Sequence, residues 1–155
     1  MAFRGFDKMA FHEIDINGFK VYFRRLPTTK KYLEIRITVR VGARLDPPGK
    51  DGLAHFLEHV AIEATEKFLV RNKIEEILFK VFDDTFGAET VFDLTAFYGG
   101  CNREADTKAI NFFKEIIFHP LMKKVSIEKE RKIIINEFWD DFHNKKNVEL
   151  LRKIY

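Results

Sequence analysis

The stretch LEIRITVRV, residues 33–41, alternates apolar residues with charged or polar ones along its whole length. Successive side chains of a β-strand point to opposite faces, so this alternation predicts a strand with one buried and one exposed face. The apolar members are Leu33, Ile35, Ile37, Val39 and Val41. This is the strand that the sequence predicts most clearly, and the rest of the expected fold is built outward from it.

Further strands are predicted on both sides of this stretch. Before it, residues 11–16 and 19–23 flank Asn17-Gly18, a dipeptide favoured in tight hairpin turns, so two paired strands are expected. After it, residues 91–98 have strand-like composition. We therefore expect an antiparallel or mixed sheet of about four strands.

Helical spacing of apolar residues begins at Leu53, after a loop over residues 42–52 that contains Pro47-Pro48-Gly49. Further helices are expected over residues 73–82, over residues 107–118, and in a last segment capped by Ser126. Together with the strands, these helices indicate the α+β class, with helices packed on one face of the sheet.

Composition limits the classes of protein that fit. The 155 residues suit one domain over 1–155, and 46% hydrophobic with 33% charged residues is typical of a soluble globular protein. No apolar run approaches the about 18 residues of a bilayer span, and no secretory signal opens the chain, so we expect a cytoplasmic protein without membrane association. A net charge of +3 without a basic cluster argues against a nucleic-acid partner.

The pentapeptide HFLEH, residues 55–59, carries the strongest chemical signal. Residues four apart lie one above the other on a helix, so the imidazoles of His55 and His59 can converge on one cation, with Glu58 on the same face. The order H-x-x-E-H is the inverted form of the zinc-protease signature H-E-x-x-H. The motif predicts metal-dependent peptide hydrolysis.

Two acids in the last predicted helix also lie on one stripe. Glu130 and Glu137 are seven residues apart, which is about two helical turns. An ordinary solvated helix face is the alternative explanation for this pair.

The chain resembles the amino-terminal catalytic domain of the M16, or pitrilysin, family of zinc metallopeptidases, which includes insulin-degrading enzyme and mitochondrial processing peptidase. Four stretches carry the resemblance: residues 33–41, Gly42-Ala43-Arg44, residues 52–59 with the HFLEH motif, and the acidic segment 130–137. The 77 residues between His59 and Glu137 are within or at the edge of the family's gap. The resemblance implies an M16 metallopeptidase-like half-domain.

It also implies roles for the candidate residues. His55, His59 and Glu137 would bind one Zn²⁺ per chain, leaving a fourth position for a water whose pKa falls to about 7. Glu58 would act as general base, and Glu130 would assist by hydrogen-bonding an imidazole. The implied substrate is a peptide or a small unfolded protein.

Family enzymes enclose their substrate between this half and a homologous second half, which this sequence does not contain. The resemblance therefore implies a homo-oligomer or a second M16-like subunit. Residues 149–155 end within helical spacing, so we also expect a domain shortened at its C-terminus. The alternative function is a noncatalytic M16-like binding or assembly subunit, favoured by the missing half and by differences from relatives after Gly87-Ala88-Glu89.

Overall fold

The computed structural model describes residues 10–25 and 31–144, with side chains described as far as Trp139. The predicted shortening at residues 149–155 lies outside these described residues. The chain divides into two units, residues 1–31 and residues 32–155. No helix within the described residues is both long enough and apolar enough to cross a lipid bilayer.

The first unit contains an antiparallel hairpin of strands β1 (His12–Ile16) and β2 (Phe19–Phe23), which confirms the predicted pair. Its turn residues, Asn17 and Gly18, have φ angles of 56° and 86°, the left-handed conformation that such tight turns require. The side chain of Asp15 accepts a 2.7 Å hydrogen bond from the Gly18 amide and closes the turn.

The second unit contains a three-stranded antiparallel sheet in the order β3 (Tyr32–Val39), β5 (Thr95–Asn102), β4 (Gly87–Thr90). The strand predicted over 33–41 is confirmed, as is the α+β class. The described strands form a two-stranded and a three-stranded sheet, and not one sheet of about four strands.

The strand predicted over residues 91–98 is wrong in its limits. Residues 91–94 form the turn between β4 and β5, closed by a 2.9 Å hydrogen bond from the Val91 amide to the Leu94 carbonyl. Val91 and Phe92 gave these positions strand-like composition, yet their side chains are 47% and 64% exposed. Apolar composition alone does not distinguish a strand from an exposed turn of this kind.

Four α-helices follow the order that the sequence predicts: α1 (Leu53–Ala61), α2 (Arg71–Ile77), α3 (Asp106–Phe118) and α4 (Lys124–Asn144). A π-helical segment, η2 (Leu78–Phe82), continues α2, and short 3₁₀ turns occupy η1 (Ala43–Leu45) and η3 (Arg103–Ala105). The predicted capping role of Ser126 is wrong. The Ile127 amide already donates to the Lys123 carbonyl at 2.9 Å, so α4 starts earlier and Ser126 is buried in its first turn.

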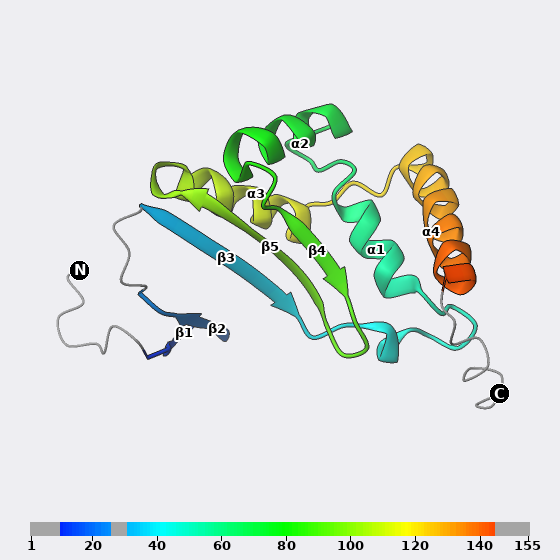
Figure 1. The fold of residues 1–155 in the computed structure, drawn as a ribbon, viewed down its shortest axis with the longest axis horizontal. Coiled ribbons are helices and arrows are strands. Elements are labelled where there is room, and N and C mark those ends of the chain that lie inside the picture. Colours follow the sequence, from blue (N-terminus) through cyan, green and yellow to red (C-terminus); the bar gives the residue numbers. More distant parts are fainter. Residues whose placement is uncertain (1–9, 26–30, 145–155) are drawn as a thin grey trace. The chain divides into compact units, whose positions relative to one another are not determined.

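The core lies between the helices and one face of the three-stranded sheet (Figure 1). Four phenylalanines from η2, the loop after it and α3 form its aromatic centre, with ring centroids 5.3–6.2 Å apart: Phe82, Phe86, Phe112 and Phe113. Phe97 and Cys101 of β5 close the core from the sheet side. Burial raises the pKa of the Cys101 thiol, which favours an unreactive, protonated packing residue.

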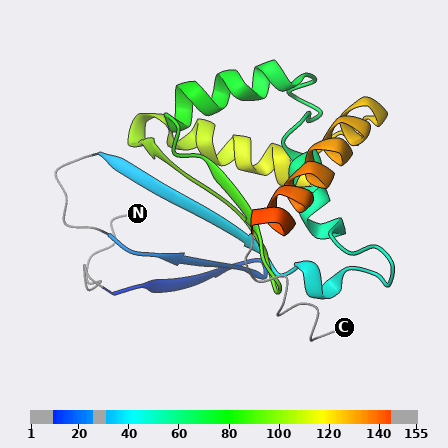
Figure 2. The ribbon, with the colours of Figure 1, turned by 45° about the vertical axis from the view of Figure 1, so that its right-hand side comes forward.

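Helix α1 lies between β4 and α4, and α1 and α4 run side by side (Figures 1 and 2). The start of α1 is fixed by Asp46, whose carboxylate accepts hydrogen bonds of 2.7 and 2.9 Å from the amides of Gly52 and Ala54. These two bonds satisfy amides that have no partner within the helix, and a negative charge is favourable at this end of the helix dipole. Asp46 thereby sets where the HFLEH segment begins.

Candidate metal centre

His55 and His59 lie on the same face of α1, as their spacing predicts. Their Nε2 atoms are 3.2 Å apart, and their rings are nearly perpendicular, at 85°. Two nitrogen atoms this close, each able to present a lone pair, form a suitable pair of donors for one cation.

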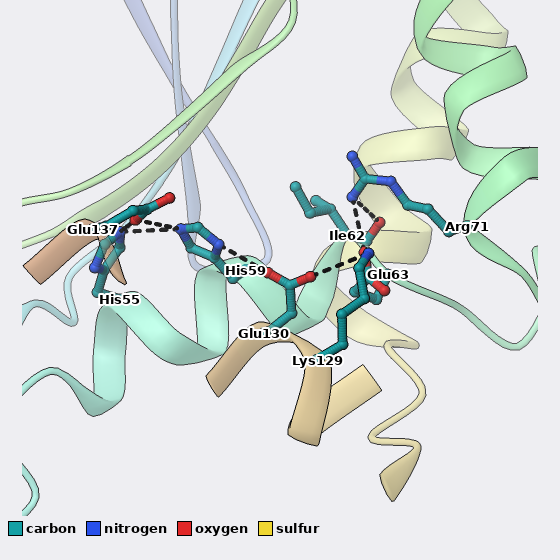
Figure 3. A network of polar contacts seen from close by, with 8 residues as sticks. All are labelled: His55, His59, Ile62, Glu63, Arg71, Lys129, Glu130 and Glu137. Carbon is teal, nitrogen blue, oxygen red and sulfur yellow. Dashed lines mark hydrogen bonds and ion pairs between the residues drawn. The ribbon is translucent and has the colours of Figure 1, made fainter. Parts of the chain in front are cut away.

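Glu137 approaches the same point from α4 (Figure 3). Its Oε2 atom lies 3.9 Å from Nε2 of His55 and 3.6 Å from Nε2 of His59. The nearest point that is equidistant from these three atoms lies in their plane, about 2.1 Å from each, which is close to the length of a zinc–nitrogen or zinc–oxygen bond in proteins. The spacing of the three donor atoms is therefore close to that of the ligands of a zinc ion.

Glu130 contacts the opposite side of the His59 ring. Its Oε2 lies 3.0 Å from Nδ1 of His59, and its side chain is only 6% exposed. A carboxylate at this position favours the tautomer in which Nδ1 carries the proton, which leaves the lone pair of Nε2 toward His55 and Glu137. The structure thus places Glu130 where an assisting acid is predicted.

Glu58 is buried, and its carboxylate lies in a cluster with His55 and His59 whose candidate ligand atoms are all within 4.8 Å of one another. Two carboxylates therefore border the histidines. They differ in their surroundings, because Glu58 accepts a 2.6 Å hydrogen bond from Thr90, whereas the side chain of Glu137 is 48% exposed. Either carboxylate is near enough to the two histidines to join them around a cation.

Sequence patterns did not predict the two hydroxyl groups next to Glu58. The Oγ1 atoms of Thr90 and Thr95 are 3.0 Å apart, and Thr95 donates a 2.8 Å hydrogen bond to the Val41 carbonyl. These residues face one another across the β4–β5 pair, so only a correct prediction of that register could have identified them.

Lys129 lies beside Glu130 on α4. Its Nζ is 3.4 Å from Oε1 of Glu130 and 3.0 Å from Oε1 of Glu63. The hydrogen bond to Glu63 is the main reason that the pKa of Lys129 is raised above its ordinary value, although partial burial acts in the opposite direction. A cation is therefore retained next to the two buried acids.

Comparison with known proteins assigns the chain to a family. The family model described as Insulinase (Peptidase family M16) matches residues 22–153. The chain belongs to this family. The predicted M16 membership is confirmed, and the candidate centre coincides with the HFLEH motif on which that prediction rested.

Sequence relatives include proteins named as zinc proteases. The chain is 29% identical over 121 residues to a protein named "Uncharacterized zinc protease" from Rickettsia bellii, which covers 78% of this chain and 29% of that protein. It is 30% identical over 114 residues to nardilysin of Homo sapiens, covering 74% of this chain and 10% of nardilysin. The chain thus spans less than a third of the length of these relatives.

Solved structures agree with the assignment. Pitrilysin superposes with a TM-score of 0.73 at 28% identity, over 85% of this M16 chain and 14% of pitrilysin. The first half of the periplasmic protease PqqL from Escherichia coli gives a TM-score of 0.77 at 19% identity, over 91% of this chain and 31% of that one. The second likeness concerns the fold alone.

Proposed function

We propose that this M16 chain is a zinc-dependent metalloendopeptidase domain that hydrolyses peptides or small unfolded proteins. The observation that supports this most directly is the convergence of His55, His59 and Glu137, whose donor atoms lie 3.2–3.9 Å apart. These three residues would hold one Zn²⁺ per chain, as the donor set and its spacing suit that ion.

When bound, Zn²⁺ supplies the Lewis acidity that activates water and polarises a peptide carbonyl. Glu58 accepts the proton of the attacking water and then delivers a proton to the leaving amine. Thr90 holds the Glu58 carboxylate through its hydroxyl, so the base is oriented before substrate arrives. Glu130 holds the ring of His59 through Nδ1.

The edge of the three-stranded sheet is the proposed site for the substrate backbone. Strand β4 pairs only with β5 among the described strands, and Thr90 at its end bonds directly to Glu58. An extended peptide that pairs with the outer edge of β4 would pass next to the base. We assign this role to β4.

We propose that a second copy or a second M16-like subunit completes the substrate surface, and that the protein acts in the cytoplasm without a nucleic-acid or membrane partner. The alternative is a noncatalytic M16-like binding or assembly subunit. The difference from relatives after Gly87-Ala88-Glu89, next to the proposed substrate strand, favours this second candidate.

One experiment tests the proposal. Zinc content and cleavage of a quenched fluorescent peptide are measured for the native chain, alone and at concentrations that allow assembly, and for Glu58→Gln. The matched control is Glu66→Gln, whose side chain is 69% exposed. We expect all three proteins to hold zinc and only Glu58→Gln to lose cleavage, by about 100-fold or more.

Equal cleavage by the native chain and Glu58→Gln would remove Glu58 from the mechanism. Full zinc occupancy with no cleavage by the native chain in any assembly state would favour the noncatalytic subunit.

A further inference from the structure

Two buried carboxylates from different elements share one ammonium group beside the candidate metal centre (Figure 3). Glu63, just after the end of α1, is 5% exposed, and Glu130 of α4 is 4% exposed. Nζ of Lys129 lies 3.0 Å from Glu63 and 3.4 Å from Glu130. Lys129 therefore connects the end of the histidine helix to the acid that contacts His59.

A second cation fixes Glu63 from the other side. The guanidinium of Arg71, at the start of α2, donates a 3.0 Å hydrogen bond to the Ile62 carbonyl and a 3.3 Å bond to Glu63. The Nε atom of Arg71 also bonds Glu75 at 3.0 Å, which limits its rotation. Glu63 is thus held by residues of α2 and α4 together.

The physical reason for this arrangement is the cost of burying charge. A buried carboxylate is strongly unfavourable unless cations and hydrogen-bond donors surround it. Glu63 has Arg71 and Lys129 as such partners, whereas the candidate chemistry requires none of these three residues. Apolar side chains of similar size could fill the same space without any buried charge. The geometry of these three charged residues has a further consequence.

That consequence concerns the plane of the Glu130 carboxylate. One of its oxygens contacts Nδ1 of His59 at 3.0 Å and the other contacts Lys129 at 3.4 Å. With both oxygens engaged, rotation of the carboxylate is restricted, and the ring of His59 is restricted with it. The position of Lys129, in turn, depends on Glu63.

We propose that Glu63 and Lys129 are positioning residues that hold Glu130 against His59 and so set the affinity of the centre for its divalent cation. This inference rests on the proposed zinc site and extends it to residues that make no contact with the candidate ligand atoms. Arg71 supports the same network through Glu63.

The test measures the Zn²⁺ affinity of the full chain by competition with a chelator for Glu63→Gln, Lys129→Met and Lys129→Arg. Partners that orient a metal-binding histidine change affinity by about 10- to 100-fold, so residues one or two contacts further away should change it by less, about three- to tenfold. We expect this loss in Glu63→Gln and Lys129→Met. Lys129→Arg keeps the positive charge and should retain affinity close to native.

Two further measurements separate positioning from a general loss of stability. The visible absorption spectrum of the Co²⁺-loaded chain should change in Glu63→Gln and Lys129→Met, and thermal unfolding with chelator present should show that each variant is folded. The double variant should bind Zn²⁺ about as well as Lys129→Met alone, because Glu63 acts through Lys129. Lys132→Met and Glu128→Gln, both exposed on α4, are the matched controls.

If the native chain binds Zn²⁺ while Glu63→Gln and Lys129→Met bind it with native affinity and an unchanged Co²⁺ spectrum, the inference is overturned and the zinc site stands. If the native chain itself fails to bind Zn²⁺, the proposed function fails and this inference with it. Should Glu63→Gln not fold, Lys129→Met decides, because the side chain of Lys129 is 52% exposed and Arg71 still pairs with Glu63 in that variant.

Discussion

The hydroxyl of Thr90 donates a 2.6 Å hydrogen bond to the carboxylate of Glu58, 32 residues earlier in the chain. This bond joins the edge strand β4 to the histidine helix α1. Because Glu58 is buried, its carboxylate depends on such a donor for a substantial part of its stability. The orientation of the candidate base is therefore set by the sheet as well as by its own helix.

We expect Thr90→Val to lower the free energy of unfolding by about 1–3 kcal/mol, because it leaves a buried carboxylate without a donor while preserving the shape of the side chain. Urea unfolding measures the change. Thr90→Ser keeps the hydroxyl and should lose much less, and Thr38→Val, at an exposed position of β3, is the matched control. Equal stability of Thr90→Val and Thr38→Val would show that the bond contributes little.

Zinc should stabilise the folded chain. A ligand at about 100 times its dissociation constant adds about 2.7 kcal/mol to the free energy of unfolding, which for a chain of this size raises the melting temperature by roughly 5–10 °C. The rise should be reversed by chelator and largely lost in Glu137→Ala at the same zinc concentration. Glu128→Ala, on the same helix, is the control. A rise of the same size in Glu137→Ala would contradict the assignment of Glu137 as a ligand.

The elements that the sequence predicts correctly are those whose own periodicity is strong. Strand β3 alternates throughout its length, and α1 carries both apolar spacing and the HFLEH motif, so local pattern was sufficient for both. Strand β4, Gly87–Thr90, was missed because four residues beginning with Gly-Ala show neither strand propensity nor a useful period. Its pairing with β5 provides the information that the local sequence lacks.

The residues of the candidate centre also differ in how far the local sequence predicts them. The helical spacing of His55 and His59 predicts their convergence directly, but Glu137 was identified through resemblance to a family and reaches the site only because α4 packs on α1. Nothing in the local sequence links Thr90 to Glu58 or Lys129 to Glu63. Such contacts are fixed by tertiary packing, which periodicity does not describe.

The phenylalanine cluster should contribute much of the stability of the second unit. Phe113 is fully buried against Phe82, at 5.3 Å between ring centroids, and against Phe86. We expect Phe113→Ala to cost about 3–5 kcal/mol, through lost burial and the cavity left behind. Phe79→Ala, where the side chain is 68% exposed, should change stability by less than about 1 kcal/mol. Urea unfolding of the two variants tests this, and similar losses would place Phe113 outside the core.

Acid should weaken an ion cluster on the surface of the α2–η2 segment. Glu76 accepts hydrogen bonds of 2.6 Å from Lys80 and 3.1 Å from Lys73, and these bonds, with that from Lys80 contributing most, lower its pKa from 4.5 to about 2. A depressed pKa means that the folded state binds the proton more weakly than the unfolded state. The stabilisation is therefore complete above pH 4.5 and is lost as the pH falls toward 2.

We expect the melting temperature of the native chain to exceed that of Glu76→Gln at neutral pH, with a difference that shrinks between pH 4.5 and about 2. The residues are exposed, so the difference should be small and should decrease further in high salt. Lys80→Met removes the leading cause of the shift and should reproduce most of the Glu76→Gln profile. If the native chain and Glu76→Gln have the same melting temperature at every pH in this range, the cluster does not stabilise the fold.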